Sequence, residues 1–94
     1  MTDLATLIKE HQGTILDVRS VPEFQEGHFP GAINVPVDQI PYKIDELKQL
    51  TQPFICYCRS GARSSMAIMI LKSNGIDEAF NAGGIMDIQH LSLS

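Results

Sequence analysis

The chain has 94 residues, of which 44% are hydrophobic, and its formal net charge at pH 7 is -4. This length is enough for one hydrophobic core and too short for two, so we predict that residues 1–94 form a single domain. The acidic balance argues against nucleic acid as the main partner, because neutralising phosphates requires clustered lysine and arginine.

No run of the sequence approaches the roughly 18 apolar residues of a membrane span. The N-terminus also lacks a basic flank followed by a long apolar core. We therefore expect no membrane partner and a cytoplasmic location. Cys56 and Cys58 are too close in sequence for an ordinary structural disulfide, and this spacing fits a reducing compartment.

The first third of the chain alternates helical and β-rich patterns. Apolar residues at helical spacing predict a helix over residues 3–10, with Thr2 or Asp3 as its cap. A buried strand is predicted over residues 14–18, where the sequence is rich in β-branched and aliphatic side chains. Next come a capped helix that ends before Gly27 and a second strand. We place these two elements at residues 22–26 and 33–35.

The rest of the chain continues the alternation. Amphipathic spacing predicts a helix over residues 42–50, and an apolar run predicts a central strand over residues 54–57. A longer helix is expected over residues 62–73, closed by Asn74 and Gly75, with Met66, Met69 and Ile70 facing inward. Finally, we expect a strand over residues 76–81 and a helix over residues 85–91.

This order of elements predicts an α/β fold with a mostly parallel sheet and helices on both faces. In such sheets, ligands bind at the carboxyl ends of the strands. Three polar or glycine-rich segments follow predicted strands: residues 17–19, the loop that begins at Cys58, and residues 81–84. We expect the three segments to converge at one edge of the sheet.

The loop from Cys58 to Arg63 carries most of the chemical information. It joins a strand to the N-terminus of a helix, so its backbone N–H groups can turn around the Cys58 sulfur. The helix N-terminus together with Arg59 and Arg63 is expected to lower the pKa of Cys58. We therefore predict that Cys58 is a nucleophile.

With these features the sequence resembles the single-domain rhodaneses over nearly its whole length. Residues 17–19 followed by 23–36 resemble the first signature of that family, and residues 57–64 resemble its active-site loop. The resemblance implies a three-layer α/β/α fold with about five short parallel strands. It also implies that Cys58 cycles between thiolate and persulfide. One departure is the absence of tryptophan after Gly83 and Gly84, so packing of the last helix is expected to differ.

The resemblance implies sulfurtransferase activity of the thiosulfate sulfurtransferase type, without a cofactor or a metal. Its donor would be a small anion such as thiosulfate, and its acceptor would be cyanide in vitro or a thiol or protein in the cell. Arg59 and Arg63 are expected to dock the donor, Arg63 foremost. The predicted substrate-binding residues are Arg59, Ser60, Gly61, Ala62 and Arg63.

Two other functions stay open at this point. One is a persulfide carrier that relays sulfur to or from a protein partner, because carriage and catalysis share the same persulfide. The other is a cysteine phosphatase or arsenate reductase, whose loop has the spacing Cys-x5-Arg. Here the spacing from Cys58 to Arg63 is Cys-x4-Arg, a tighter ring that suits one sulfur atom better than a tetrahedral oxyanion.

The remaining polar candidates have simpler interpretations. Cys56 is expected to point into the core, with a redox role beside Cys58 as the alternative. Asp17 and Arg19 are expected to pair with each other and support the loop. His28 is expected to anchor a turn, because no other residue has the spacing needed for a shared metal.

Overall fold

The computed structural model describes residues 3–93, which fold around one parallel sheet. Its strands are β1 (Thr14–Asp17), β2 (Ile33–Asn34), β3 (Phe54–Cys58) and β4 (Ala79–Gly84), in the spatial order β2-β1-β3-β4. All neighbouring strands run parallel. Because they are parallel, the carboxyl ends of the two central strands, β1 and β3, lie at the same edge of the sheet.

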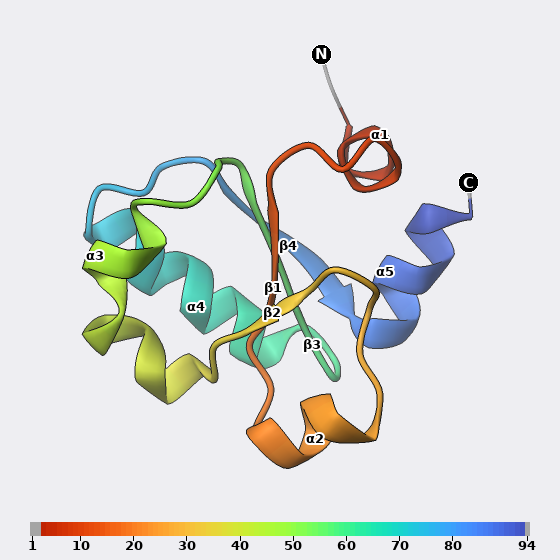
Figure 1. Cartoon of the computed structure of the whole chain (residues 1–94), viewed down its shortest axis with the longest axis horizontal. Helices are drawn as coiled ribbons and strands as arrows, with labels where there is room; N and C mark the ends of the chain where they lie inside the picture. The colour runs from red at the N-terminus through yellow and green to blue at the C-terminus, as the bar shows by residue number, and fades with distance from the viewer. Residues whose placement is uncertain (1–2, 94) are drawn as a thin grey trace.

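Helices cover both faces of this sheet in the described part of the chain. Figure 1 shows α3 and α4 on one side of the strands and α1 and α5 on the other. The helical elements are α1 (Leu4–Lys9), α2 (Val21–Glu26), the 3-10 helix η1 (Val37–Tyr42), α3 (Ile44–Leu47), α4 (Ala62–Ser73) and α5 (Ile85–Ser92).

The strand β3 divides the core because successive side chains on a strand point to opposite faces. Its residues Phe54, Cys56 and Cys58 pack with α3, α4 and η1, whereas Ile55 and Tyr57 pack with α1 and α5. All five are buried, as expected for a central strand of a parallel sheet. The predicted three-layer α/β/α architecture is therefore present.

Several helix ends agree with the capping signals. Asp3 caps α1 by accepting a hydrogen bond from the Thr6 N–H, while Thr2 lies outside the described residues. Ser20 and Glu23 form the predicted capping box of α2. Helix α4 has the predicted bounds.

The sheet has four strands within residues 3–93, fewer than the five implied by the family resemblance. The four β-rich runs read from the residues themselves correspond to these four strands. The prediction of the fourth strand at residues 76–81 was wrong in its bounds, because Ile76 is used to close α4 and bury against the core. The strand instead runs on through the paired glycines, with Cys58 opposite Gly84.

The prediction of one helix over residues 42–50 was also wrong in its bounds. The chain forms η1 first, and only residues 44–47 are α-helical. Turns of the tighter i to i−3 type then continue through Leu50, which still packs its side chain on the core. Amphipathic spacing therefore located the buried face but not the type of helix.

The inward face of α4 was mispredicted at Met66 and Met69, whereas Ile70 packs against the core as expected. Met66 and Met69 are 57% and 69% exposed, whereas Ser64, Ala67 and Leu71 are buried. Residues 66–71 are apolar all round the helix, so spacing alone does not define its inner face. In the first turn of the helix the Ser64 hydroxyl contacts Asn81 of β4, which is consistent with this face lying against the sheet.

None of the helices formed by residues 3–93 combines the length and apolar character needed to cross a membrane.

Candidate active site

The loop after β3 closes around the sulfur of Cys58. The Gly61 N–H donates a hydrogen bond to Sγ at 2.9 Å, and the Ser64 hydroxyl lies 3.6 Å from Sγ. Gly61 has a φ of 104°, a left-handed conformation that glycine adopts without strain. Cys58 itself is only 1% exposed. A reacting atom therefore meets the sulfur inside the loop and not on the open surface.

This environment favours the thiolate of Cys58. Burial raises the pKa of the thiol, but it is outweighed by hydrogen bonds from the Ser64 N–H and hydroxyl and from the Ser60 and Gly61 backbone. Together they hold the pKa of Cys58 below its usual value of 9.0. Hydrogen bonds to the charged form stabilise it, and a thiolate is the reactive form of cysteine.

Replacing Ser64 by alanine is expected to raise the pKa of Cys58, because one of the groups that stabilise the thiolate is lost. Alkylation of Cys58 by iodoacetamide at pH 7 should then be several-fold slower, with its pH profile moved to higher pH. The matched control is Ser65→Ala, since Ser65 is exposed on the same helix. A profile unchanged in Ser64→Ala would exclude this hydroxyl as a donor to the sulfur.

Asn81 ties the loop to β4. Its side-chain amide donates to the Gly61 carbonyl at 3.1 Å, and its carbonyl oxygen lies 2.7 Å from the Ser64 hydroxyl oxygen. The same oxygen accepts from the Gly83 N–H at 2.8 Å. The predicted convergence of the Cys58 loop with residues 81–84 is therefore confirmed.

Gly84 touches the other side of the loop through its backbone. A Cβ atom placed on Gly84 would overlap the carbonyl oxygen of Arg59. The φ of Gly84 is -91°, which any residue adopts, so glycine is required here by the close approach of the two backbones. The Gly84 N–H is held by Asp87 at 2.7 Å.

Gly84→Ala is expected to displace the loop, because the new methyl group meets backbone atoms that no rotamer change can move. Misplacement of the reacting groups by about 1 Å lowers turnover on the order of 100-fold. Stability should fall by only about 1 to 3 kcal/mol, as in other overpacked sites. Gly75→Ala, at a strained but open position, controls for destabilisation alone. Equal loss of turnover in both variants would contradict a specific effect on the loop.

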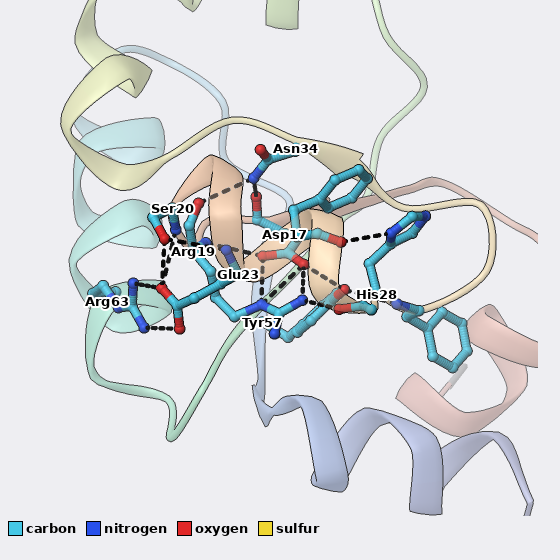
Figure 2. Close-up of polar contacts among 11 residues, drawn as sticks. Asp17, Arg19, Ser20, Glu23, His28, Asn34, Tyr57 and Arg63 are labelled. Atoms are coloured by element: carbon cyan, nitrogen blue, oxygen red, sulfur yellow. Dashed lines mark hydrogen bonds and ion pairs between the residues drawn. The ribbon is translucent and has the colours of Figure 1, made fainter.

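Arg63 turns away from the loop toward α2. Its Nη1 and Nη2 donate to the two carboxylate oxygens of Glu23 at 2.7 and 3.0 Å (Figure 2). This hydrogen-bonded ion pair lowers the pKa of Glu23 to about 2. Arg63 also feels the Cys58 charge, which contributes to its raised pKa after the larger effect of Glu23. The predicted docking arginine is therefore already paired in the resting site.

Arg59 borders a pocket of about 260 Å³ between the Cys58 loop, α2 and α5. Its lining combines two arginines, two glutamates and two uncharged residues: Arg19, Arg59, Glu23, Glu26, Gly27 and Ile85.

Beneath this pocket lies a buried network centred on Asp17. Asp17 pairs with Arg19, with a closest distance of 2.6 Å, and accepts a hydrogen bond from the Tyr57 hydroxyl at 2.7 Å. Arg19 also donates to the Gly27 carbonyl at 2.7 Å, and the Tyr57 hydroxyl accepts from the Phe29 N–H at 2.9 Å (Figure 2). The predicted pairing of Asp17 with Arg19 is confirmed, and it anchors the turn after α2.

His28 and Cys56 take the simpler roles expected of them. The His28 ring stacks on Phe24 with centroids 3.7 Å apart, and its Nδ1 lies 3.0 Å from the Phe24 carbonyl oxygen. Cys56 is fully buried in the core, and burial raises its pKa to about 12. A thiol with such a pKa stays protonated at neutral pH.

Of the predicted site residues, Ser60 and Gly61 contact the sulfur of Cys58 through their backbone. Arg59 lines the neighbouring pocket, and Arg63 pairs with Glu23. Ala62 opens α4. Ser64, Asn81 and Glu23 were not proposed as site residues. For Ser64 the available signal was a hydroxyl in the first turn of the helix after the loop. For Asn81 it was an amide two residues before the first of the paired glycines.

The fold and site define an α/β protein in which a loop holds a buried cysteine sulfur at the carboxyl end of a central parallel strand. A family model for the rhodanese-like domain matches residues 1–91, so the chain belongs to the rhodanese-like family. The thiosulfate sulfurtransferase PspE of Escherichia coli (strain K12) is 34% identical over 74 residues, which are 78% of this chain and 71% of PspE.

Two further proteins are similar to this chain. YrkF of Bacillus subtilis (strain 168), described as a candidate sulfur carrier protein, is 34% identical over 67 residues. These are 71% of this chain but only 36% of YrkF. Human single-domain sulfurtransferase TSTD1 superposes with a TM-score of 0.77 at 24% identity, covering 93% of this chain and 89% of TSTD1. The TSTD1 match supports the fold.

Proposed function

We propose that this chain is a single rhodanese-like domain that moves a sulfane sulfur from a donor such as thiosulfate to a thiophilic acceptor. The observation that carries the proposal is the buried Cys58 sulfur at the end of β3, which accepts a hydrogen bond from the Gly61 N–H of the loop and whose pKa is lowered. That environment suits a reaction between already ionised species. The sulfurtransferase PspE, similar over 78% of this chain, supports the same reaction class.

In the first step the Cys58 thiolate attacks the outer sulfur of thiosulfate. The S–S bond of thiosulfate breaks, and sulfite leaves with the bonding electron pair. Cys58 is left as a persulfide whose outer sulfur carries the negative charge. In the second step an acceptor nucleophile attacks that outer sulfur and releases the thiolate. Cyanide then leaves as thiocyanate, whereas a thiol leaves as a persulfide.

The loop supplies electrostatic stabilisation through Arg59, Ser60, Gly61, Ala62 and Arg63. In this proposal the backbone N–H groups of these residues hold the outer sulfur, as the Gly61 N–H already holds Sγ, and each fixed donor is worth about 3 kcal/mol in a transition state. The mechanism uses no general base, because the lowered pKa of Cys58 favours the thiolate that attacks the donor. The guanidinium of Arg59, on the pocket beside the loop, serves to attract an anionic donor.

A second candidate function is relay of the same persulfide to or from a protein partner. Its support is the similarity to YrkF, the candidate sulfur carrier. A phosphatase or arsenate reductase has less support, because Arg63 is paired with Glu23 and not turned toward an oxyanion above Cys58.

Intact-mass spectrometry of the purified protein tests the proposal directly. Incubation with thiosulfate should add about 32 Da, the mass of one sulfur atom as a persulfide, and cyanide should remove it. Failure to load from thiosulfate, together with loading from a protein persulfide, would favour the relay function. Failure with both donors would refute sulfur transfer.

A further inference from the structure

The Glu23–Arg63 pair joins two segments that are 40 residues apart in the sequence. Glu23 lies in the first turn of α2, where it also accepts hydrogen bonds from the Ser20 N–H at 3.2 Å and hydroxyl at 3.0 Å. Arg63 lies in the first turn of α4, next to the Cys58 loop. Glu23 is therefore held by its own helix in a position that keeps the Arg63 side chain against α2.

The two side chains match in geometry and cancel in charge. Both terminal nitrogens of Arg63 face both carboxylate oxygens of Glu23, the bidentate arrangement that is the strongest of arginine–carboxylate contacts. The Arg63 and Glu23 side chains are 37% and 27% exposed, so the pair lies at the surface of the site. An anion that approaches Cys58 therefore meets a neutralised arginine beside a carboxylate.

We propose that Glu23 is a specificity-determining residue that weakens the binding of small dianionic sulfur donors by occupying Arg63. This inference rests on the proposed function, since it concerns the donor of the same site. Glu23 lines the pocket beside the loop, and it acts there by holding Arg63 against α2 and by its own negative charge. A donor such as thiosulfate must bind against that carboxylate or draw Arg63 away from it.

The variant that tests this is Glu23→Gln. Glutamine keeps an oxygen for the capping box of α2 and for one hydrogen bond from Arg63, so α2 should stay folded. Removal of one negative charge beside a dianion should lower the thiosulfate KM by roughly three- to tenfold, with kcat little changed. Glu46→Gln is the matched control, because it makes the same change in net charge at the exposed pair with Lys43.

A second readout does not depend on sulfur transfer. Cys58 is alkylated by iodoacetate, which is anionic, and by iodoacetamide, which is neutral and similar in size. Glu23→Gln should raise the ratio of the iodoacetate rate to the iodoacetamide rate, whereas a purely structural change in the loop would alter both rates together. Failure of the wild type to use thiosulfate would refute only the proposed donor, because the rate ratio still tests the role of Glu23.

The same variant in an Arg63→Ala background shows whether Glu23 acts through Arg63. In that background Glu23→Gln should raise the ratio of the iodoacetate rate to the iodoacetamide rate by less, because no Arg63 side chain is left to be freed from Glu23. An alkylation ratio in Glu23→Gln equal to those of the wild type and Glu46→Gln would overturn the proposal. A gain in the alkylation ratio that is undiminished without Arg63 would also overturn it, because Glu23 would then act by its charge alone and not by occupying Arg63.

Discussion

Cys58→Ser is expected to abolish persulfide formation and to leave the fold intact. Serine has nearly the shape of cysteine and can accept the hydrogen bond from the Gly61 N–H. Its hydroxyl is not ionised at neutral pH and does not form a stable adduct with a sulfane sulfur. After incubation with thiosulfate, the intact mass should stay that of the free protein. Thiocyanate production from thiosulfate and cyanide should fall to the uncatalysed rate.

The matched control is Cys56→Ala, which removes the other cysteine two residues earlier on the same strand. Burial raises the pKa of Cys56 to about 12, so this thiol does not compete for the donor. Cys56→Ala should therefore still load one sulfur and lose it to cyanide. Loading that persists in Cys58→Ser and disappears in Cys56→Ala would show that the wrong cysteine has been assigned.

The largest effect on stability is expected from Asp17→Ala. Asp17 is fully buried and accepts hydrogen bonds from the Arg19 N–H and guanidinium and from the Tyr57 hydroxyl. Its removal leaves Arg19, which is 6% exposed, as a buried charge without its carboxylate. Breaking a buried pair in this way costs roughly 3 to 5 kcal/mol in the free energy of unfolding. Urea denaturation followed by circular dichroism measures it.

Two further variants make this result interpretable. Asp17→Asn keeps the shape of the side chain and should cost less, which provides a measurable protein if Asp17→Ala does not fold. Glu46→Gln breaks the exposed pair with Lys43 and should change stability by less than about 1 kcal/mol. A similar small loss in Asp17→Ala would mean that the network around Asp17 contributes little to folding.

Much of the fold could be predicted because its signals are local. The capping box of Ser20 and Glu23 marks the start of α2, and the apolar run over residues 54–57 marks the central strand. What failed depends on contacts between distant segments. On the inner face of α4, Ser64 contacts β4, and the true end of β4 is set by its pairing with Cys58.

The candidate site divides in the same way. Cys58 and the turn at Gly61 were predicted from a thiol at the end of a strand and a glycine before a helix. The role of Gly84 was not predicted, because position 84 requires glycine only on account of the Arg59 carbonyl that lies against it. The partner of Arg63 was not predicted either, because nothing near Arg63 in the sequence indicates that Glu23 lies beside it.

The sequence by itself determined the order of helices and strands, the thiol at the carboxyl end of β3 and the glycine that turns the loop. These follow from side-chain periodicity, capping and backbone conformation, which act over a few residues. Only the tertiary structure decided which groups surround that thiol and which charges remain to meet a substrate. Three contacts depend on how separate elements pack: the Ser64 hydroxyl beside the sulfur, the hydrogen bond from Asn81 to the loop, and the Glu23–Arg63 pair.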